Sequence, residues 1–147
     1  EIADGDWSSD VCSSDLAAGL AVLEYMVKHN LVENSRRNGE YLHNKLETLN
    51  DNPTVGDIRG IGLFAGIEFV RDKETKDPFD PEIKFYDKVV EQCYENGLLI
   101  YPGVGTIDGV KGDHIQVAPP LITTKEEVDE IVKILTESIN QVEAQFL

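Results

Sequence analysis

The apolar positions of the chain change their spacing several times, and these changes predict helices and strands in a mixed order. From Ala17 the segment AAGLAVLEYMVKHN is apolar almost all round, which is typical of a helix buried on several sides. The next apolar or small residues lie three or four positions apart, which places one stripe on one face of a second helix. They are Leu31, Ser35, Gly39, Leu42, Leu46 and Leu49. The small residues within this stripe predict a close approach by another backbone.

The region after this second helix predicts two strands and a charged loop. The sequence NDNP at residues 50–53 ends the helix, because Asn, Asp and Pro favour turns and the residue before Pro avoids the helical region. Residues 55–58 and 63–70 have the composition of strands, and we expect residues 59–62 to form a turn or bulge between them. The segment RDKETKDPFD at residues 71–80 is then a hairpin tip or loop.

A third helix and two further strands follow. Asp80, Pro81 and Glu82 predict a capped helix start, and Gly97 marks the end of that helix. The sequences LLIY and HIQVA are typical of strands, and the glycine-rich segment PGVGTIDGVKGD separates them.

The last helix has the clearest start signal, because Thr124 and Glu127 form a capping box. Its apolar stripe consists of Val128, Ile131, Val132, Leu135, Ile139, Val142 and Phe146. The whole order of elements predicts an α+β fold, in which helices pack against a small, mostly antiparallel sheet.

Composition narrows the classes of protein. The 147 residues carry a formal net charge of −15, which disfavours nucleic-acid and anionic-membrane partners. No apolar run approaches the roughly 20 residues that span a bilayer, and the N-terminus lacks the order of a signal peptide. We therefore expect one domain of a cytoplasmic protein. Nothing else about the chain suggests a disulfide-rich scaffold, so Cys12 and Cys93 are predicted to be free thiols.

Taken residue by residue, the sequence predicts no catalytic centre. The loop GVGTIDG lacks the spacing of a dinucleotide fingerprint and precedes a strand, so we interpret it as a connection between neighbouring strands or a loop lining another site. His29, His43 and His114 have no partner at metal-ligand spacing. Cys93 lies near the apolar face of its helix, where packing is the expected role.

Three sequence words, in this order and spacing, resemble a known family. They are VGDIRGIGLFAGIEFVRDKETKDPFDPE, CYENGLLIYPG and GDHIQVAPPLITTKEEVDEIVKIL. Together they are similar to the C-terminal small domain of class III aminotransferases, which are fold-type-I enzymes that use pyridoxal 5′-phosphate (PLP). The resemblance covers residues 17–147, and we expect this range to be an N-terminally truncated small domain.

The resemblance implies a homodimeric parent enzyme that moves an amino group from an amine or ω-amino acid to a keto acid such as pyruvate. In that family a lysine and an acidic residue of the large domain hold PLP. Neither lies in this chain, so we expect no catalytic and no cofactor-binding residue here, and an inactive fragment.

The resemblance also indicates two substrate-binding residues. In branches acting on ornithine, acetylornithine or 4-aminobutyrate, an arginine in the strand before the double proline binds the substrate carboxylate, and Gln116 occupies that position. In the ω-amino acid:pyruvate branch a mobile arginine lies just upstream of the G-D pair, about where Lys111 stands. Neither residue offers the two-pronged guanidinium fork. Arg59 is expected to hold the strand turn rather than the substrate.

The first 16 residues do not fit this picture. In the family, a threonine- and glycine-rich segment introduces the helix at Ala17, whereas this chain has GDWSSDVCSSDL. Residues 6–16 resemble the translation of a common short-read sequencing adapter in one frame, and the preceding adapter bases also fit Gly5. We therefore expect residues 1–16 to be a non-native leader, with residues 5–16 as a library artefact.

Other functions stay open at this stage. A stand-alone, acidic α+β module that regulates a partner by holding a small ligand would equally lack a cofactor lysine. An aminomutase or decarboxylase of the same family would share this domain.

Overall fold

The computed structural model describes residues 13–146, and these belong to two compact units, 1–32 and 33–147. The first unit contains helix α1, Ser13–Lys28. Its large apolar side chains are exposed, among them Leu20 at 57% and Val27 at 82%. The prediction of a helix buried on several sides is therefore wrong for the described chain. The reason is that the described part of this unit provides no other complete helix or strand to cover α1.

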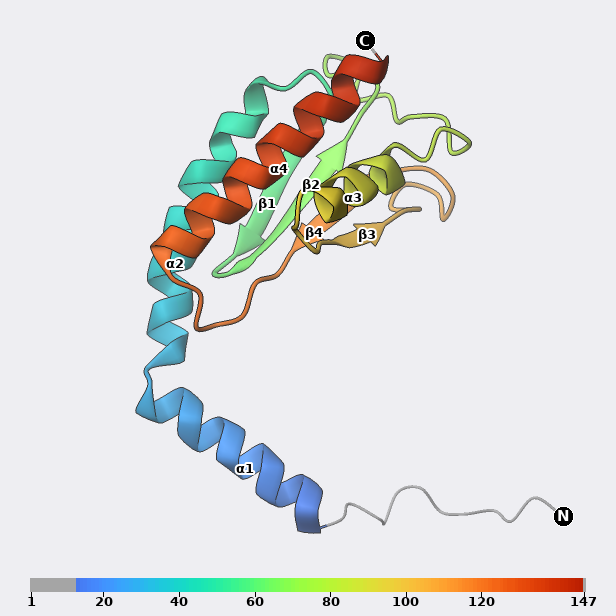
Figure 1. Ribbon diagram of the computed structural model, residues 1–147. Helices are drawn as coiled ribbons and strands as arrows, with labels where there is room; N and C mark the ends of the chain where they lie inside the picture. The colour runs from blue at the N-terminus through green and yellow to red at the C-terminus, as the bar shows by residue number, and fades with distance from the viewer. Residues whose placement is uncertain (1–12, 147) are drawn as a thin grey trace, which may run out of the picture. The chain divides into compact units, whose positions relative to one another are not determined.

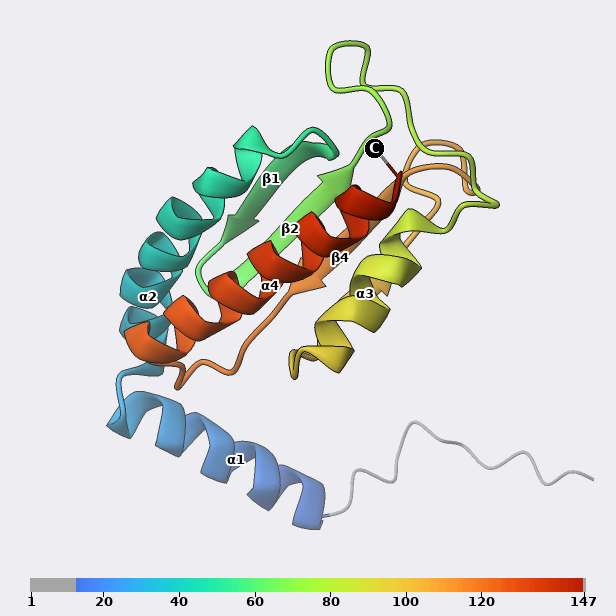
Figure 2. The ribbon, with the colours of Figure 1, turned by 45° about the horizontal axis from the view of Figure 1, so that its top comes forward.

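The second unit is an antiparallel sheet with helices against it. The elements are α2 Leu31–Leu46, the 3-10 helix η1 Glu47–Asp51, β1 Val55–Ile61, β2 Phe64–Phe69, α3 Phe85–Glu95, β3 Tyr101–Gly103, β4 Asp113–Val117 and α4 Lys125–Phe146. The strand order is β1-β2-β4-β3, and every pairing is antiparallel. Helices α3 and α4 lie over one face of the sheet, and α2 runs along β1 (Figure 1 and Figure 2). This arrangement confirms the α+β prediction.

The core lies between this face of the sheet and the helices. Ile58, Ile67 and Ile115 stand opposite one another on β1, β2 and β4, and the last two are fully buried. Leucines of α2 and the predicted apolar stripe of α4 close over them. Side chains alternate between the two faces of a strand, so the residues on either side of these isoleucines point away from the helices.

The predicted close approach at α2 is confirmed. A Cβ atom at Gly39 would stand 2.2 Å from the backbone carbon of Gly62, so only glycine permits this contact. Beside it, the backbone N–H of Leu63 donates to the Ser35 hydroxyl at 3.2 Å. The small residues of the α2 stripe therefore hold the tip of the β1–β2 hairpin.

The turn of this hairpin is shorter than predicted. Gly62 takes a positive φ of 55° and turns the chain together with Leu63, so Arg59 and Gly60 stay in the β1 ladder opposite Gly66 and Ala65. The prediction that residues 59–62 form the turn is wrong, and so is the assignment of Arg59 to it. The irregularity of the ladder lies between Val55 and Asp57.

Helix α3 starts later than the sequence predicts. The Asp80 carboxylate accepts from the N–H of Glu82 at 3.0 Å, which forms a local turn rather than a helix start. Lys84 then takes a positive φ of 51°, and the helix begins only at Phe85. Its first turn receives a cap from a distant residue, because the N–H of Tyr86 donates to the Asp113 carboxylate at 3.2 Å. The predicted end is confirmed, since α3 stops just before Gly97, which has a φ of 91°.

Other local predictions divide between confirmed and wrong. In the capping box of α4, Thr124 N–H donates to Glu127 Oε2 at 2.8 Å and Glu127 N–H donates to Thr124 Oγ1 at 3.3 Å. The strand predicted at LLIY is displaced, because β3 begins at Tyr101. Residues 71–80 form a loop with one bridge between Asp72 and Asp77, as predicted.

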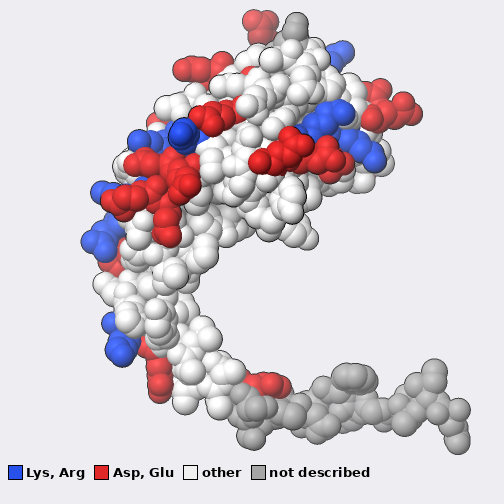
Figure 3. Space-filling model, in the orientation of Figure 1, with Lys and Arg blue, Asp and Glu red and all other residues white. Residues whose placement is uncertain are grey.

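The polar and titratable side chains divide between the core and the surface. Cys93 is packed in the core, and this burial raises the pKa of its thiol; Cys12 lies outside the described residues. Acidic and basic side chains mix over α2 and α4 (Figure 3). On α2, Arg36 pairs with Glu33 at 2.6 Å and with Glu40 at 2.8 Å.

Among the helices of residues 13–146, none combines the length and the apolar character that crossing a bilayer requires.

Candidate functional site

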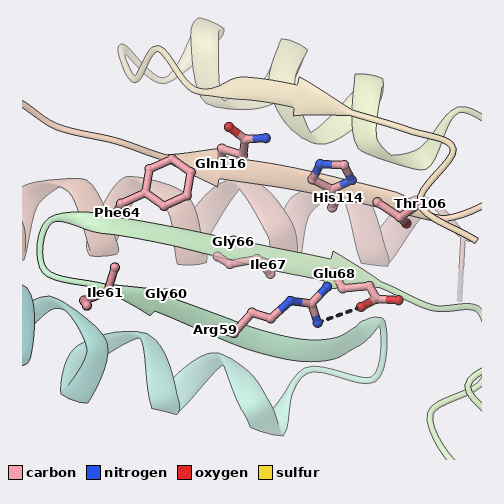
Figure 4. A pocket seen from close by; sticks show the side chains of 10 residues that line it. All are labelled: Arg59, Gly60, Ile61, Phe64, Gly66, Ile67, Glu68, Thr106, His114 and Gln116. Atoms are coloured by element: carbon pink, nitrogen blue, oxygen red, sulfur yellow. Dashed lines mark hydrogen bonds and ion pairs between the residues drawn. The ribbon is translucent and has the colours of Figure 1, made fainter.

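The sheet face that points away from the helices contains a cavity of about 430 Å³. Strands β1, β2 and β4 form its floor, and Thr106 contributes from the loop between β3 and β4 (Figure 4). Its lining residues are Arg59, Gly60, Ile61, Phe64, Gly66, Ile67, Glu68, Thr106, His114 and Gln116. Here the helices do not fill the space above the strands, so side chains of this face are available to a ligand.

A glycine in the middle strand creates the hollow. The strand register places Arg59, Gly66, Gln116 and Tyr101 in one row across β1, β2, β4 and β3. A Cβ atom at Gly66 would find only the Arg59 carbonyl oxygen within 4 Å, at 3.8 Å. The row therefore has a gap between the long side chains of Arg59 and Gln116, and in Figure 4 the Gln116 side chain lies over β4 on the side toward β3.

The row toward the hairpin tip is apolar. Ile61 and Phe64 are paired in the register, and they are 84% and 47% exposed. Both line the cavity, and they give it one hydrophobic end. Exposed apolar side chains around a concave site favour an apolar part of a ligand.

The row at the opposite end carries charge. Arg59 Nη1 contacts the carboxylate of Asp57 and lies 3.2 Å from Glu68 Oε2. The hydrogen bond that Arg59 donates to Asp57, followed by the one it donates to Glu68, raises the pKa of Arg59. In Figure 4 the Arg59 side chain runs along β1 toward Glu68. The one guanidinium of the cavity lining is thus shared by two carboxylates.

His114 also lines this end of the cavity, and its imidazole lies against Gly103 of β3. A Cβ atom at Gly103 would lie 2.1 Å from His114 Nε2, so the imidazole packs directly against the backbone of β3. His114 Nδ1 is buried and has no hydrogen-bond partner among the described residues. His114 was not predicted to line a site, since its neighbours come from two other strands.

The residue before it, Asp113, lies on the helix-covered side and is 1% exposed. Burial raises the pKa of its carboxyl, while the N–H groups of Tyr86 and Phe85 act in the opposite direction. Asp113 therefore joins the start of β4 to the start of α3. This link fixes the end of the loop that passes beside the cavity.

The segment that follows β4 is held by amide side chains of α2. Asn34 Nδ2 donates to the carbonyl oxygen of Leu121 at 2.7 Å, and Asn38 Nδ2 donates to that of Thr123 at 2.7 Å. These bonds hold the segment that follows Pro119 and Pro120. Gln116 is therefore positioned by anchors on both sides of β4.

The two predicted substrate-binding residues do not share a cavity. Gln116 lines the cavity on the open sheet face, whereas Lys111 lines a separate cavity of about 470 Å³ together with Arg71 and Asp77. Lys111 is exposed, and its N–H donates to the Asp108 carboxylate at 2.8 Å within a loop turn. The structure brings Gln116 together with Arg59 and Phe64 instead. The alternating residues R-x-I in β1 and F-x-G-x-E in β2 are the sequence pattern from which this group could have been predicted.

The described residues do not provide a PLP site. PLP enzymes hold the cofactor through a Schiff-base lysine and a partner of its pyridine nitrogen. All nine lysines fall within residues 13–146, and none is buried or lines the cavity on the open sheet face. Within the same residues there is no group of three or more His, Cys, Asp or Glu side chains placed to hold a metal ion.

Comparison with known proteins gives consistent matches. Residues 12–139 match the family model described as aminotransferase class-III. An uncharacterized aminotransferase of Schizosaccharomyces pombe is 47% identical over 124 residues, which are 84% of this chain and 27% of that protein.

Solved structures agree with this. One is a transaminase from work on directed evolution by ancestral reconstruction, with a TM-score of 0.79, 38% identity and coverage of 88% of this chain and 27% of that one. Another is a PLP-bound aminotransferase mutant from Vibrio fluvialis, with a TM-score of 0.72, 29% identity and coverage of 80% and 24%. The chain thus spans about a quarter of the proteins it matches.

Proposed function

Because the chain belongs to the class III aminotransferase family, we propose that it is the C-terminal part of a PLP-dependent transaminase. In this proposal the parent enzyme transfers an amino group from an amine or ω-amino acid to a keto acid such as pyruvate, and it acts as a cytoplasmic homodimer. The observation that carries the proposal is the family match over residues 12–139. This match favours the enzyme fragment over a stand-alone regulatory module.

The cofactor in this proposal is held by polypeptide outside the chain. PLP supplies an electron sink for the amino-group transfer when it is bound. The described lysines fit no such site, so we assign to this chain a role in shaping the substrate pocket. The PLP-bound relative supports the use of the cofactor by the parent.

Within the chain, we propose Gln116 as the residue that contacts substrate. Its place in the cavity lining, opposite Gly66 in the strand register, supports this role, because its amide would both donate and accept hydrogen bonds there. Lys111 stays a second candidate, and its exposed position in the loop before β4 makes it available to a substrate approaching from that side.

The proposal is tested with the full-length gene product that contains this chain. Supplied with PLP, it is expected to show a bound-cofactor absorption band and to convert pyruvate to alanine with an amine donor. The 147-residue chain alone, as the matched control, is expected to show neither. A full-length product that binds PLP but releases carbon dioxide from an amino acid, or only shifts its amino group within one molecule, would overturn the transaminase assignment.

We also propose that residues 1–16 are a non-native leader, with residues 5–16 derived from a sequencing adapter. The composition of residues 6–16 supports this proposal. Resequencing the locus from genomic DNA with a different library chemistry tests it. Recovery of the same codons in the genome would refute it.

A further inference from the structure

We propose that Lys76 is a positioning residue that holds a β-bulge at Gly56, and that this bulge fixes Asp57 beside Arg59 on the open sheet face. The inference goes beyond the transaminase assignment, because it concerns how the chain builds this face. Only its expected effect on turnover rests on the proposed function.

The ladder between β1 and β2 contains one extra residue on β1. Val55 stands opposite Phe69, and the next pair is Asp57 with Glu68. Two steps along β1 thus match one step along β2. Gly56 lies between these pairs and has no partner of its own, which is the pattern of a β-bulge. Such an extra residue bends its strand and redirects the side chains next to it.

The bulge changes the face on which the side chains of β1 lie. Val55, Asp57 and Arg59 are spaced two residues apart, so in an uninterrupted strand all three would lie on one face. Instead Val55 is fully buried in the core, whereas Asp57 and Arg59 are exposed and form a salt bridge. The extra residue at Gly56 therefore allows one strand to supply both the core and the open face.

Lys76 supplies a hydrogen bond to the bulge. Its ammonium group donates to the carbonyl oxygen of Gly56. The lysine also lines a cavity of about 290 Å³ together with Asp57 and Glu68, so it lies beside the residues that the bulge redirects. In a ladder without the bulge, Gly56 would join the pairing and Val55 would turn to the open face. A charged donor on the Gly56 carbonyl therefore favours the bulged register.

The loop after β2 is built to bring Lys76 to this place. The Asp72 carboxylate accepts hydrogen bonds from the N–H groups of Glu74 at 2.9 Å and Thr75 at 3.0 Å, which closes the tip of the loop. Lys76 takes a φ of 61°, a left-handed conformation that is uncommon for lysine and costs free energy unless contacts offset it. The bond to the Gly56 carbonyl is such a contact.

Lys73 provides a matched control, because it is a second lysine of this loop with a different target. Its ammonium group donates to the carbonyl oxygens of Asn50 and Asn52, where η1 gives way to β1. Lys73→Met therefore removes the same charge and the same kind of contact from the same loop, and it leaves the bond to the bulge in place.

The guanidinium signal of Arg59 tests the proposal without any turnover. It is recorded by NMR in the ¹⁵N-labelled 147-residue chain and in its Lys76→Met, Lys76→Arg and Lys73→Met variants. We expect Lys76→Met to shift this signal. Lys76→Arg retains a charged donor and is expected to keep the native signal, as is Lys73→Met. A native signal in Lys76→Met, or an equal shift in Lys73→Met, would overturn the proposal.

A deletion keeps the proposal testable if Lys76→Met loses its dispersed amide spectrum. Removing Gly56 leaves Val55 opposite Phe69 and Asp57 opposite Glu68 in an uninterrupted ladder, so no bulge remains for a lysine to hold. We expect this deletion to restore a dispersed spectrum to the Lys76→Met variant. A double variant that stays unfolded would refute the role of Lys76 at the bulge.

Kinetics of the full-length enzyme extend the test to function. Arg59 lines the cavity of the open sheet face and is not assigned to the reacting atoms, so its displacement is expected to weaken binding more than chemistry. We expect Lys76→Met to raise KM for the amino donor about threefold with little change in kcat. Lys76→Arg should restore KM, and an unchanged KM in Lys76→Met would contradict the proposal. A parent that fails to transaminate would refute the proposed function and leave the Arg59 signals as measured.

Discussion

The two faces of the sheet differ in what the same strands are used for. On the covered face, Ile67 and Ile115 are fully buried beneath the helices. On the other face, Gly66 and Gln116 are their immediate neighbours in sequence, and they border an open cavity. Alternation along a strand thus separates a stabilising face from one available for ligands. The comparison teaches that residues of β2 and β4 on the open face are less buried than those on the covered face, although His114 still packs against the backbone of β3.

The largest expected effect comes from truncating a buried side chain on the covered face. Ile67→Ala is expected to lower the free energy of unfolding by about 2–5 kcal/mol, because it removes buried methylenes and leaves a cavity. The matched change on the open face, Ile61→Ala, is expected to stay within about 0.5 kcal/mol. Urea denaturation of the two variants measures the difference. Equal losses would show that the two faces are not distinct.

The next prediction tests the contact between Gly39 and Gly62, which packs the tip of the β1–β2 hairpin against α2. Gly39→Ala places a Cβ atom against the Gly62 backbone, so we expect destabilisation by about 1–3 kcal/mol. The control is Gly19→Ala in α1, where a Cβ atom would meet nothing within 4 Å. That change should favour the helix by about 0.5–1 kcal/mol. Denaturant midpoints and far-UV circular dichroism report both, and a neutral Gly39→Ala would contradict the close contact.

A smaller effect concerns Asp113, the charged residue of β4 on the covered side. Burial raises the pKa of this carboxyl, so the folded protein binds its proton more tightly than the unfolded chain. The contribution of Asp113 to stability is therefore full below its unfolded-state pKa, falls as the pH rises through the raised pKa, and is constant above it.

The variant Asp113→Asn isolates this contribution. It keeps an oxygen that accepts the Tyr86 N–H, and it removes the titration. Urea midpoints of both proteins are measured across the acidic range, and the difference between variant and native protein should grow in favour of the variant as the pH rises. A difference that does not change with pH would show that burial does not raise the pKa of Asp113.

Local signals in the sequence account for much of this fold. The capping box at Thr124 and Glu127 and the apolar stripe of α4 depend on residues a few positions apart, and both are confirmed. The start of α3 was predicted wrongly, because its cap comes from Asp113, 27 residues away. The exposure of α1 was also missed, since an apolar segment does not reveal what covers it.

The candidate site was less accessible to sequence reasoning than the fold. The family resemblance indicated Gln116, which does line the cavity. The pairing of Arg59 with Glu68 depends on strand register, because those two residues are nine positions apart and meet only across the β1–β2 ladder. The local pattern around Arg59 suggested a turn, and a single glycine with positive φ was sufficient to place that turn at Gly62.

The central proposal is that the open sheet face forms the substrate-facing wall of the parent transaminase. Its most direct test is the steady-state kinetics of full-length Gln116→Ala, with an ω-amino acid as donor and pyruvate as acceptor. We expect kcat/KM for the ω-amino acid to fall about tenfold, the loss of one good hydrogen bond to its distal carboxylate, while the bound-cofactor absorption band is unchanged. A kcat/KM equal to that of the native enzyme would contradict the account.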